Sequence, residues 1–376
     1  MDDFKIIATT FKGLESVLED EIRRLGGRNI RRLVRAVSFY GDKAMLYEAN
    51  GVLSTALRVL KPVAHLRNLK SVAAVYNKVY DIPWENYFDP DKTVFFHVSG
   101  QLDTIPHSHF VSQKVKDALV DRFRDRFGRR PAVDKQAAQV VIDLHLFRDQ
   151  MSVSLDSSGE PLFKRGYRRR TGRAPLNEAL AAGIIRLTGW RADRHLIDPM
   201  CGSGTIPIEA ALQAARIPPG FLGRSFAFMH WKDYDPALFE TLKRRHMSRV
   251  RPPVEIIRIQ GYDKDARMVE TARENALAAG VEEYVSFEVR DFFQTQKIPG
   301  PTTLLFNPPY DQRLSLAGRE AFYERVGKHL QEAYHWSTVW ILSPELWNKY
   351  LGRRAFKVFK LMNGKIPVYL AGYRIE

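Results

Sequence analysis

The stretch LIDPMCGSGTIPIEAAL, residues 196–212, decides the fold because a short apolar strand, a glycine turn and a helix follow one another in it without a gap. The apolar run ends at Asp198, the turn holds Gly202 and Gly204, and apolar residues at helical spacing follow. Glycine has no Cβ, so this turn can bring bare backbone close to a ligand. Pro207 replaces the third glycine of a dinucleotide fingerprint, and the lysine of a Walker loop is missing. The stretch predicts a ligand loop in a doubly wound α/β fold, although backbone geometry alone also explains such a turn.

A second segment, residues 256–281 (IIRIQGYDKDARMVETARENALAAGV), favours the ligand loop. A β-rich run ends there at Asp263, and a helix continues to a stop at Gly280. A carboxylate at the end of a second strand can accept hydrogen bonds from both hydroxyls of a ribose. The alternative role, a helix N-cap, can fall to Asp265 instead. Because the spacing from the glycine turn exceeds the roughly 20 residues usual for this fold, we expect residues 216–253 to be an insertion.

A third segment, residues 302–314 (TTLLFNPPYDQRL), is a strand that runs into Asn307, two prolines and Tyr310. The prolines fix the turn and keep Asn307 extended, so its side-chain amide and the Pro308 carbonyl can point at one substrate atom. Two acceptors beside an aromatic ring suit an exocyclic amine of a stacked base. The alternative is a polar turn with a tyrosine in the core.

The motifs DPMCGSGT, YDKD and NPPY together resemble those of class I S-adenosylmethionine-dependent methyltransferases that modify amino groups of bases. More closely, the chain resembles the guanine-N2 methyltransferases of large-subunit (23S) ribosomal RNA that carry a THUMP domain, which residues 106–134 and 154–183 also match. The resemblance implies S-adenosylmethionine as cofactor and N2 of a guanosine in ribosomal RNA as the methyl acceptor. Larger members carry a second methyltransferase module, and the end at Glu376 leads us to expect only the guanine-N2 module.

The candidate site residues come from these motifs and from the end of the strand Val285–Val289, where an acid can bind the adenine amine and a ring can cover the base. The candidate catalytic residues are Asn307, Pro308 and Tyr310. The candidate cofactor-binding residues are Asp198, Cys201, Gly202, Ser203, Gly204, Thr205, Asp263, Lys264, Asp291, Phe292 and Asn307. The resemblance adds Asn177 and Glu178 as weaker candidates, since that stretch borders the cofactor in the family.

Composition points to a polyanionic partner, because 58 basic and 43 acidic residues give a formal charge of +15. A membrane surface is the competing partner, but no apolar run reaches spanning length and the acidic start is unlike a signal peptide, so a cytoplasmic protein is expected. Cys201 is the single cysteine, which excludes an internal disulfide and a cysteine zinc cluster. It also argues against methylation at C5 of a pyrimidine, which needs a cysteine nucleophile near the base. No metal-ligand spacing appears, so no metal is expected.

The chain is expected to hold three units: a ferredoxin-like unit at 1–60, a THUMP RNA-binding domain at 61–156 and a Rossmann-like methyltransferase domain with a seven-stranded, mostly parallel sheet at 157–376. The first two units together form an α+β region. The expected strands are Phe4–Thr9, Val37–Tyr40, Thr93–Val98, Gln139–Phe147, Met151–Leu155, Leu196–Asp198, Glu255–Tyr262, Val285–Val289, Thr302–Phe306, Thr338–Leu342, Phe356–Leu361 and Ile366–Tyr373. The expected helices outside the motifs include Gly13–Leu25, Lys43–Val59, Phe110–Phe127 and Ala174–Leu187.

Three segments are candidates for RNA contact. The helix end 122–130 carries five arginines with two phenylalanines between them, and a solvated helix face is the alternative. The segment 162–173 (LFKRGYRRRTGR) has six basic residues, no acid and Tyr167 as a possible stacking ring, and it either lies along phosphates or is simply a flexible linker. The insertion carries Phe226, Phe228, Trp231 and Tyr234, for which core packing is favoured over base stacking.

Other functions share these features. A transfer RNA substrate keeps the same chemistry, and a DNA adenine methylase also uses NPPY. A protein of another class, a non-catalytic RNA-binding factor in ribosome assembly, would need no intact site. The complete set of Asp198, Gly202, Gly204, Asp263 and Asn307 argues against that last alternative.

Overall fold

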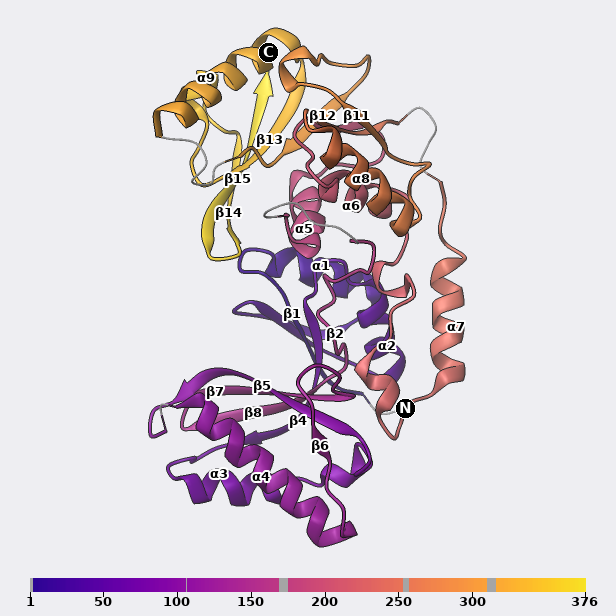
Figure 1. Cartoon of the computed structure of the whole chain (residues 1–376), viewed down its shortest axis with the longest axis vertical. Helices are drawn as coiled ribbons and strands as arrows, with labels where there is room; N and C mark the ends of the chain where they lie inside the picture. Colours follow the sequence, from indigo (N-terminus) through magenta and orange to yellow (C-terminus); the bar gives the residue numbers. More distant parts are fainter. Residues whose placement is uncertain (1–2, 106, 169–174, 253–256, 310–315) are drawn as a thin grey trace.

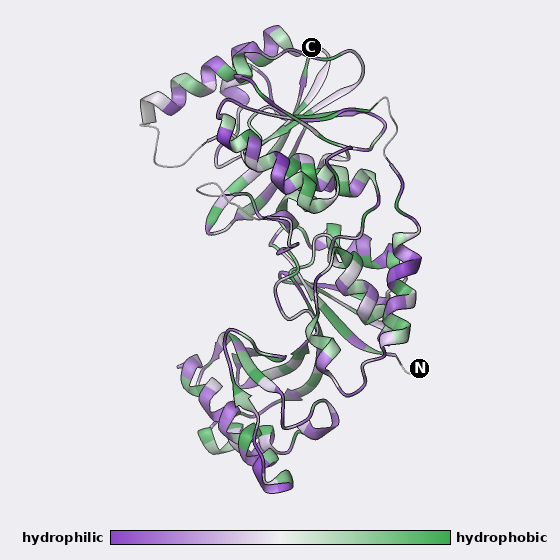
Figure 2. Ribbon diagram, turned by 45° about the vertical axis from the view of Figure 1, so that its right-hand side comes forward, coloured by the Kyte–Doolittle hydropathy of each residue, from purple (hydrophilic) through white to green (hydrophobic). Residues whose placement is uncertain are grey.

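The computed structural model describes residues 3–105, 107–168, 175–252, 257–309 and 316–376. In this part of the chain the strands form two sheets, one of eight strands near the N-terminus and one of seven strands near the C-terminus. The two sheets lie in separate lobes of an elongated molecule (Figure 1). Hydrophobic residues are concentrated in the strands of both sheets, whereas the outer helices alternate hydrophobic and hydrophilic stretches (Figure 2).

The eight-stranded sheet has the order β2-β3-β1-β4-β8-β7-β5-β6. Its strands are β1 Phe4–Thr9, β2 Arg28–Leu33, β3 Ala36–Gly41, β4 Arg58–Leu66, β5 Thr93–Leu102, β6 Ala132–Val133, β7 Val140–Arg148 and β8 Gln150–Asp156. Strand β4 pairs with β1 on one side and with β8 on the other, so both N-terminal units share one sheet. The expected border at residue 60 therefore falls inside a strand. The hairpin β7–β8 is confirmed as an antiparallel pair.

The helices of this region are α1 Glu15–Leu25, α2 Lys43–Val52, α3 Val72–Tyr80 and α4 Ser108–Phe127, with a short 3₁₀ helix η1 at Trp84–Asn86. The predicted helix Lys43–Val59 is wrong beyond Val52, because Leu53 is extended and β4 begins at Arg58. Pairing of β4 with β1 provides a tertiary preference that overrides the local pattern. Strand β2 was not predicted, since its side chains are almost all exposed and show no alternation.

The seven-stranded sheet has the order β11-β10-β9-β12-β13-β15-β14. Its strands are β9 His195–Asp198, β10 Ile259–Asp263, β11 Ser286–Val289, β12 Thr302–Phe306, β13 Ser337–Ser343, β14 Lys357–Asn363 and β15 Ile366–Ile375. The pairs from β11 through β13 are parallel, and β15 joins β13 and β14 antiparallel. This arrangement confirms the predicted seven-stranded, mostly parallel sheet.

The helices of the C-terminal half are α5 Glu178–Thr188, α6 Thr205–Ala214, α7 Pro236–Met247, α8 Ala266–Ala279, α9 Leu316–Ala333 and α10 Asn348–Leu351, with 3₁₀ turns η2 Pro219–Phe221, η3 Ala227–His230 and η4 Phe292–Gln294. The expected helix Ala174–Leu187 begins later, at Glu178, because the Asn177 side chain caps it by accepting from the backbone N–H groups of Ala179 and Leu180. None of the described helices combines the length and the hydrophobicity of a membrane-spanning segment.

The insertion after α6 does not stay with the seven-stranded sheet. It places α7 beside α2 of the N-terminal lobe (Figure 1). Its apolar side chains belong to the same core as that lobe: Phe221, Phe226, Phe228, Trp231, Phe239 and Leu242. The ring of Phe228 stacks on Tyr47 of α2 with centroids 4.4 Å apart. The prediction that the aromatics of the insertion pack in a core is confirmed.

Candidate functional site

The candidate site lies at the carboxyl edge of the seven-stranded sheet. Strands β9, β10 and β12 are parallel, so their carboxyl ends meet at one edge. Asp198 ends β9, Asp263 ends β10 and Asn307 directly follows β12. Strand β9 lies between β10 and β12, which is where the order of the strands reverses. Open α/β sheets bind ligands at this switch point, outside the carboxyl ends of the strands.

The loop after β9 holds two glycines, and their surroundings differ. Gly204 has φ +83°, and a Cβ there would lie 2.9 Å from both Ala272 and Phe287, so packing against α8 and β11 excludes a side chain. Gly202 has φ +53°, yet a Cβ there would meet no atom within 4 Å. The backbone at Gly202 therefore faces open space, where a ligand can approach it.

The loop is held from its inner side. The side-chain amide of Asn275 donates to the carbonyl of Ser203 at 3.1 Å, and the Cys201 N–H donates to the carbonyl of Tyr262 at 2.8 Å. Cys201 is buried, and burial raises the pKa of its thiol well above the ordinary value. A raised pKa favours the protonated thiol, which agrees with the absence of a predicted nucleophilic role for this cysteine.

Asp263 is tied to the glycine loop through both carboxylate oxygens. Its Oδ2 accepts from the Gly202 N–H at 3.0 Å, and its Oδ1 accepts from the Asp265 N–H at 2.9 Å. Each oxygen keeps a further lone pair for another donor. Asp265 caps α8 by accepting from the Arg267 N–H, so the alternative capping role falls to Asp265 as expected. Lys264 between them is exposed.

Asp198 is a second acid at this edge and is almost completely buried. Its Oδ1 accepts from the Met200 N–H at 3.1 Å. Burial raises the pKa of this carboxyl well above its ordinary value, since the charged form loses its hydration. The two remaining loop candidates, Ser203 and Thr205, are also buried.

Asp291 and Phe292, which come shortly after β11, have different roles in the fold. Asp291 caps η4 by accepting from the Phe293 N–H at 3.0 Å. Phe292 is only 4% exposed, and its ring lies nearly parallel to that of Tyr334 with centroids 6.2 Å apart. The Phe292 ring therefore packs in the core, and its predicted contact with an adenine stays a prediction. Asp291 stays a candidate.

Asn307 follows β12 and has an unusual polar environment. Its Oδ1 is buried and makes no hydrogen bond within the part of the chain that the structure describes. Pro308 beside it is buried, and the Pro309 carbonyl accepts from the Tyr323 hydroxyl at 3.3 Å, which anchors the turn to α9. Tyr310 lies outside the described residues. A buried acceptor without a donor costs roughly 1–3 kcal/mol, so this oxygen is poised for a donor from a ligand.

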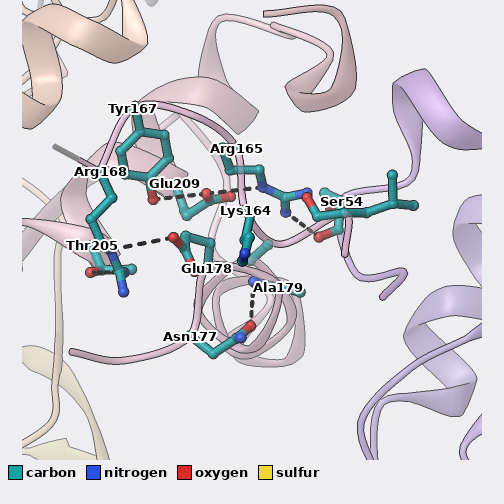
Figure 3. A network of polar contacts seen from close by, with 12 residues as sticks. Ser54, Lys164, Arg165, Tyr167, Arg168, Asn177, Glu178, Ala179, Thr205 and Glu209 are labelled. Carbon is teal, nitrogen blue, oxygen red and sulfur yellow. Dashed lines mark hydrogen bonds and ion pairs between the residues drawn. The ribbon is translucent and has the colours of Figure 1, made fainter. Parts of the chain in front are cut away.

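Part of the basic segment after β8 differs from both predicted roles, a phosphate contact and a flexible linker, because some of its side chains are buried. Figure 3 shows Arg165 and Tyr167 turned inward toward Glu209 of α6. Arg165 Nε lies 3.4 Å from Glu209 Oε1 and the Tyr167 hydroxyl donates to the same oxygen at 3.1 Å, while all three side chains are buried. Arg165 also donates to the carbonyls of Leu162 and Ser54. Tyr167 is thus no stacking ring, because paired charges and hydrogen bonds hold this segment in the interior.

The next residues of the segment complete this correction. Arg168 also points inward, to Thr205 and Glu178, whereas Lys164 is exposed and pairs with Glu160 at 3.0 Å. Arg169, Arg170 and Arg173 lie outside the described residues. An acid in the apolar helix sequence IPIEAAL, residues 206–212, was the signal for a buried ion pair, because lone charges in such a stretch are rare.

The arginine-rich end of α4 is only partly a surface for RNA. Arg122 is buried and forms a bidentate pair with Glu85 at 2.7 Å for both contacts, so its role is structural. Arg124 and Arg130 are exposed and line a groove of about 620 Å³. That groove is shared with basic, acidic and apolar residues: Tyr76, Lys114, Lys116, Asp117, Val120, Asp121, Pro131, Ala132 and Val133.

The sheet order, the open glycine loop after β9, the acid after β10 and the asparagine-proline turn after β12 define a class I methyltransferase fold. Residues 165–371 match the family model of the RMKL-like methyltransferase domain. Residues 70–156 match the THUMP domain and residues 5–60 the RlmL ferredoxin-like domain. The chain belongs to the RMKL-like methyltransferase family, which confirms the family expected from its motifs.

Curated relatives cover the chain almost completely. It is 40% identical over 377 residues to the ribosomal RNA large subunit methyltransferase K/L of Psychromonas ingrahamii, with 98% of this chain and 50% of that protein covered. The chain therefore spans half the length of that relative. It is 32% identical over 373 residues to a putative RNA methyltransferase, slr0064, of Synechocystis, with 98% of this chain and 96% of that protein covered.

Solved structures agree over the whole chain. The putative methyltransferase SMU.472, complexed with SAH, is 30% identical with a TM-score of 0.89 and covers 100% of this chain and 99% of its own. A possible methylase from Clostridium difficile 630 is 28% identical with the same TM-score of 0.89 over 100% of this chain and 99% of its own. A predicted N6-adenine-specific DNA methylase from Listeria monocytogenes is 30% identical with a TM-score of 0.86 over 99% of this chain and 96% of its own.

Proposed function

We propose that this chain transfers a methyl group from S-adenosylmethionine to the exocyclic N2 amine of a guanosine in large-subunit ribosomal RNA. The observation that carries the proposal is the buried Oδ1 of Asn307, which accepts no hydrogen bond from any described residue and lies at the sheet edge that also holds Asp198 and Asp263. An amine donor relieves the cost of that oxygen, and the exocyclic amino group of a substrate base is such a donor. The resemblance to enzymes of guanine-N2 supports N2 as the target atom.

The residues present fit S-adenosylmethionine. The open backbone at Gly202 can approach it, and the free lone pairs of Asp263 can accept from its ribose hydroxyls. Asp291, at the end of the neighbouring strand, is the candidate for its adenine amine. The complex of SMU.472 with SAH, the demethylated form of this cofactor, supports the assignment. When bound, S-adenosylmethionine supplies a methyl group on a positively charged sulfur.

The protein contributes position rather than a strong base. A guanine N2 amine is a weak nucleophile, because its lone pair is delocalised into the ring. Asn307 Oδ1 accepts one of its hydrogens and the Pro308 carbonyl is the candidate for the other, so the nitrogen lone pair is aimed at the methyl carbon. The amine becomes acidic as the new bond forms, and its proton then leaves through these acceptors or water. Tyr310 is the candidate for stacking on a guanine swung out of its helix.

The choice of RNA as substrate is supported by the charge of +15 and by the THUMP domain. Large-subunit ribosomal RNA is favoured by the name of the Psychromonas relative, and transfer RNA is the nearest alternative. The described groove beside α4 offers exposed cations from Arg124 and Arg130 for phosphates. A DNA adenine substrate would use the same amine-binding turn, so it belongs in the test.

The test is transfer of radiolabelled methyl from S-adenosylmethionine to separately purified large-subunit ribosomal RNA, small-subunit ribosomal RNA, transfer RNA and DNA. We expect label in the large-subunit RNA alone, recovered as N2-methylguanosine after digestion. Label in transfer RNA or DNA would show that the substrate is that nucleic acid instead. If the chain binds RNA but labels no nucleic acid, the non-catalytic alternative is favoured. The Asn307→Ala variant is the matched control for contaminating activity.

A further inference from the structure

Arg168 joins two segments at the start of helix α6 (Figure 3). One nitrogen, Nη2, donates to the carbonyl of Leu176 at 2.8 Å and to the hydroxyl of Thr205 at 3.0 Å. Leu176 precedes the cap of α5, and Thr205 is the first residue of α6, directly after Gly204. Because Nη2 carries two hydrogens, these contacts use both of them. The guanidinium therefore fixes the end of the glycine loop against the segment that leads into α5.

The environment of this guanidinium is that of an interior group. The side chain of Arg168 is 14% exposed and that of Glu178 is 5% exposed, and Arg168 Nε lies 3.3 Å from Glu178 Oε1. Burial raises the pKa of Glu178, and the positive charge of Arg168 opposes that rise. An arginine whose charge is balanced inside the protein and whose hydrogens point inward is poorly placed to neutralise an RNA phosphate. Its position instead points to the glycine loop.

The hydroxyl of Thr205 gains a defined direction from this contact. A hydroxyl that accepts from a guanidinium keeps its own hydrogen, which it can then donate to another acceptor. The proposed site of the adenine lies on the β11 side of the sheet edge, and the reacting methyl group must face Asn307 after β12. The loop after β9 lies between these two positions, so we expect it to contact the amino-acid tail of S-adenosylmethionine. That tail ends in a carboxylate, which accepts hydrogen bonds well.

We infer that Arg168 is a positioning residue for the cofactor: it orients the Thr205 hydroxyl and the end of the glycine loop toward the amino-acid tail of S-adenosylmethionine. The inference rests on the proposed function, since it needs that cofactor. It separates Arg168 from the neighbouring basic residues, whose charge in the sequence looks the same. It also predicts which part of the cofactor the residue serves.

The experiment compares two ligands by calorimetry: S-adenosylhomocysteine, which has the amino-acid tail, and 5′-methylthioadenosine, which lacks it. Arg168→Gln should weaken binding of S-adenosylhomocysteine about tenfold or more, the effect of losing one charge-assisted hydrogen bond. Binding of 5′-methylthioadenosine should change less than about twofold. A general loss of structure would weaken both ligands alike and would overturn the inference.

Matched variants separate the contact from the fold. Lys164→Gln removes an exposed positive charge from the same segment and should leave both affinities unchanged. Thr205→Val removes the acceptor without touching the Arg168–Glu178 pair and should weaken S-adenosylhomocysteine as Arg168→Gln does, whereas Thr205→Ser keeps the hydroxyl and should bind normally. The double variant Arg168→Gln/Thr205→Val should be no worse than either single one, because both act on one contact. Additive losses would overturn the inference.

RNA binding should be unaffected by Arg168→Gln, in contrast to binding of S-adenosylhomocysteine. The salt dependence of RNA affinity should be the same for wild type and Arg168→Gln, since no phosphate contact is lost. A flattened salt dependence together with unchanged affinity for S-adenosylhomocysteine would assign Arg168 to RNA and overturn the inference. If the wild-type chain binds neither small ligand, the proposed function fails and this inference with it. If the wild type binds and Arg168→Gln binds equally well, this inference alone fails.

Discussion

Asp263 and Asn307 lie at the same edge of one sheet but are held in opposite ways. Both oxygens of Asp263 accept backbone N–H groups, one from the glycine loop and one from the start of α8. Asn307 Oδ1 is buried and makes no hydrogen bond to any described residue. The fold itself thus holds the Asp263 carboxylate in place, whereas no described residue donates a hydrogen bond to Asn307 Oδ1.

This difference suggests that Asp263 contributes to binding of the cofactor and Asn307 to the reaction. A carboxylate fixed before the ligand arrives loses little freedom on binding, which favours affinity for the cofactor. An unmet acceptor gains its hydrogen bond only when the reacting amine is present, so its contribution belongs to the reaction. Substitutions at these two positions should therefore change different quantities.

The largest effect is expected from Asn307→Ala. Turnover should fall by about two to four powers of ten, the range for removing one well-placed catalytic group. Affinities for S-adenosylhomocysteine and RNA should stay within about twofold, because the variant removes a single contact to the reacting amine, whereas Asp263 and the remaining RNA contacts are kept. Single-turnover kinetics with bound RNA measure the first effect and calorimetry measures the second. A near-normal rate would remove Asn307 from the reaction.

Asp263→Ala should act on the cofactor instead. The affinity for S-adenosylhomocysteine should fall about tenfold or more, since a charged acceptor for the ribose and an anchor of the Gly202 N–H are both lost. RNA affinity should not change. The matched control is Asp265→Ala, two residues away, which should lower the free energy of unfolding by about 1 kcal/mol through loss of the α8 cap and keep cofactor affinity. Equal losses of cofactor affinity in both variants would contradict the assignment of cofactor binding to Asp263 and of helix capping alone to Asp265.

The smallest effect concerns Asp198, the second acid of the cofactor side. Burial raises the pKa of its carboxyl in the folded protein, so the folded state holds this proton more tightly than the unfolded state. Stability from this group is therefore complete below the unfolded pKa, about 3.9, and is lost as the pH rises toward the folded pKa. Asp198→Asn has no such loss.

Chemical unfolding at a series of pH values, without cofactor, tests this expectation. The free energy of unfolding of Asp198→Asn relative to wild type should increase with pH, by up to about 1.4 kcal/mol for a change from about pH 5 to about pH 6. A difference that is the same at every pH would mean that Asp198 ionises in the folded protein as it does in the unfolded chain.

Much of the methyltransferase lobe could be predicted from sequence because its central strands are short apolar runs buried on both faces. The expected strand Thr302–Phe306 agrees with β12 at both ends, and the expected strand Ile366–Tyr373 begins where β15 begins. The strand β2 has no such pattern, because its side chains are almost all exposed. Prediction therefore worked where burial imposes a local pattern.

The site could be predicted in its motifs but not in its partners. The roles of Asp263 and Asp265 follow from their order along the chain, and the structure agrees on the cap. The burial of Arg165 could not be read locally, since its partner Glu209 lies 44 positions along the chain. The aromatics of the insertion pack with α2, which is still farther away in sequence. Contacts of this range are decided by the tertiary fold.

The central claim, methylation of guanine N2 in large-subunit ribosomal RNA, is tested most directly by mass mapping of modified nucleosides in RNA from cells with and without this protein. The account predicts that one N2-methylguanosine disappears from large-subunit ribosomal RNA and returns with the wild-type chain but not with Asn307→Ala. An unchanged ribosomal RNA, or a lost methyl group on any atom other than an exocyclic amine, would contradict it.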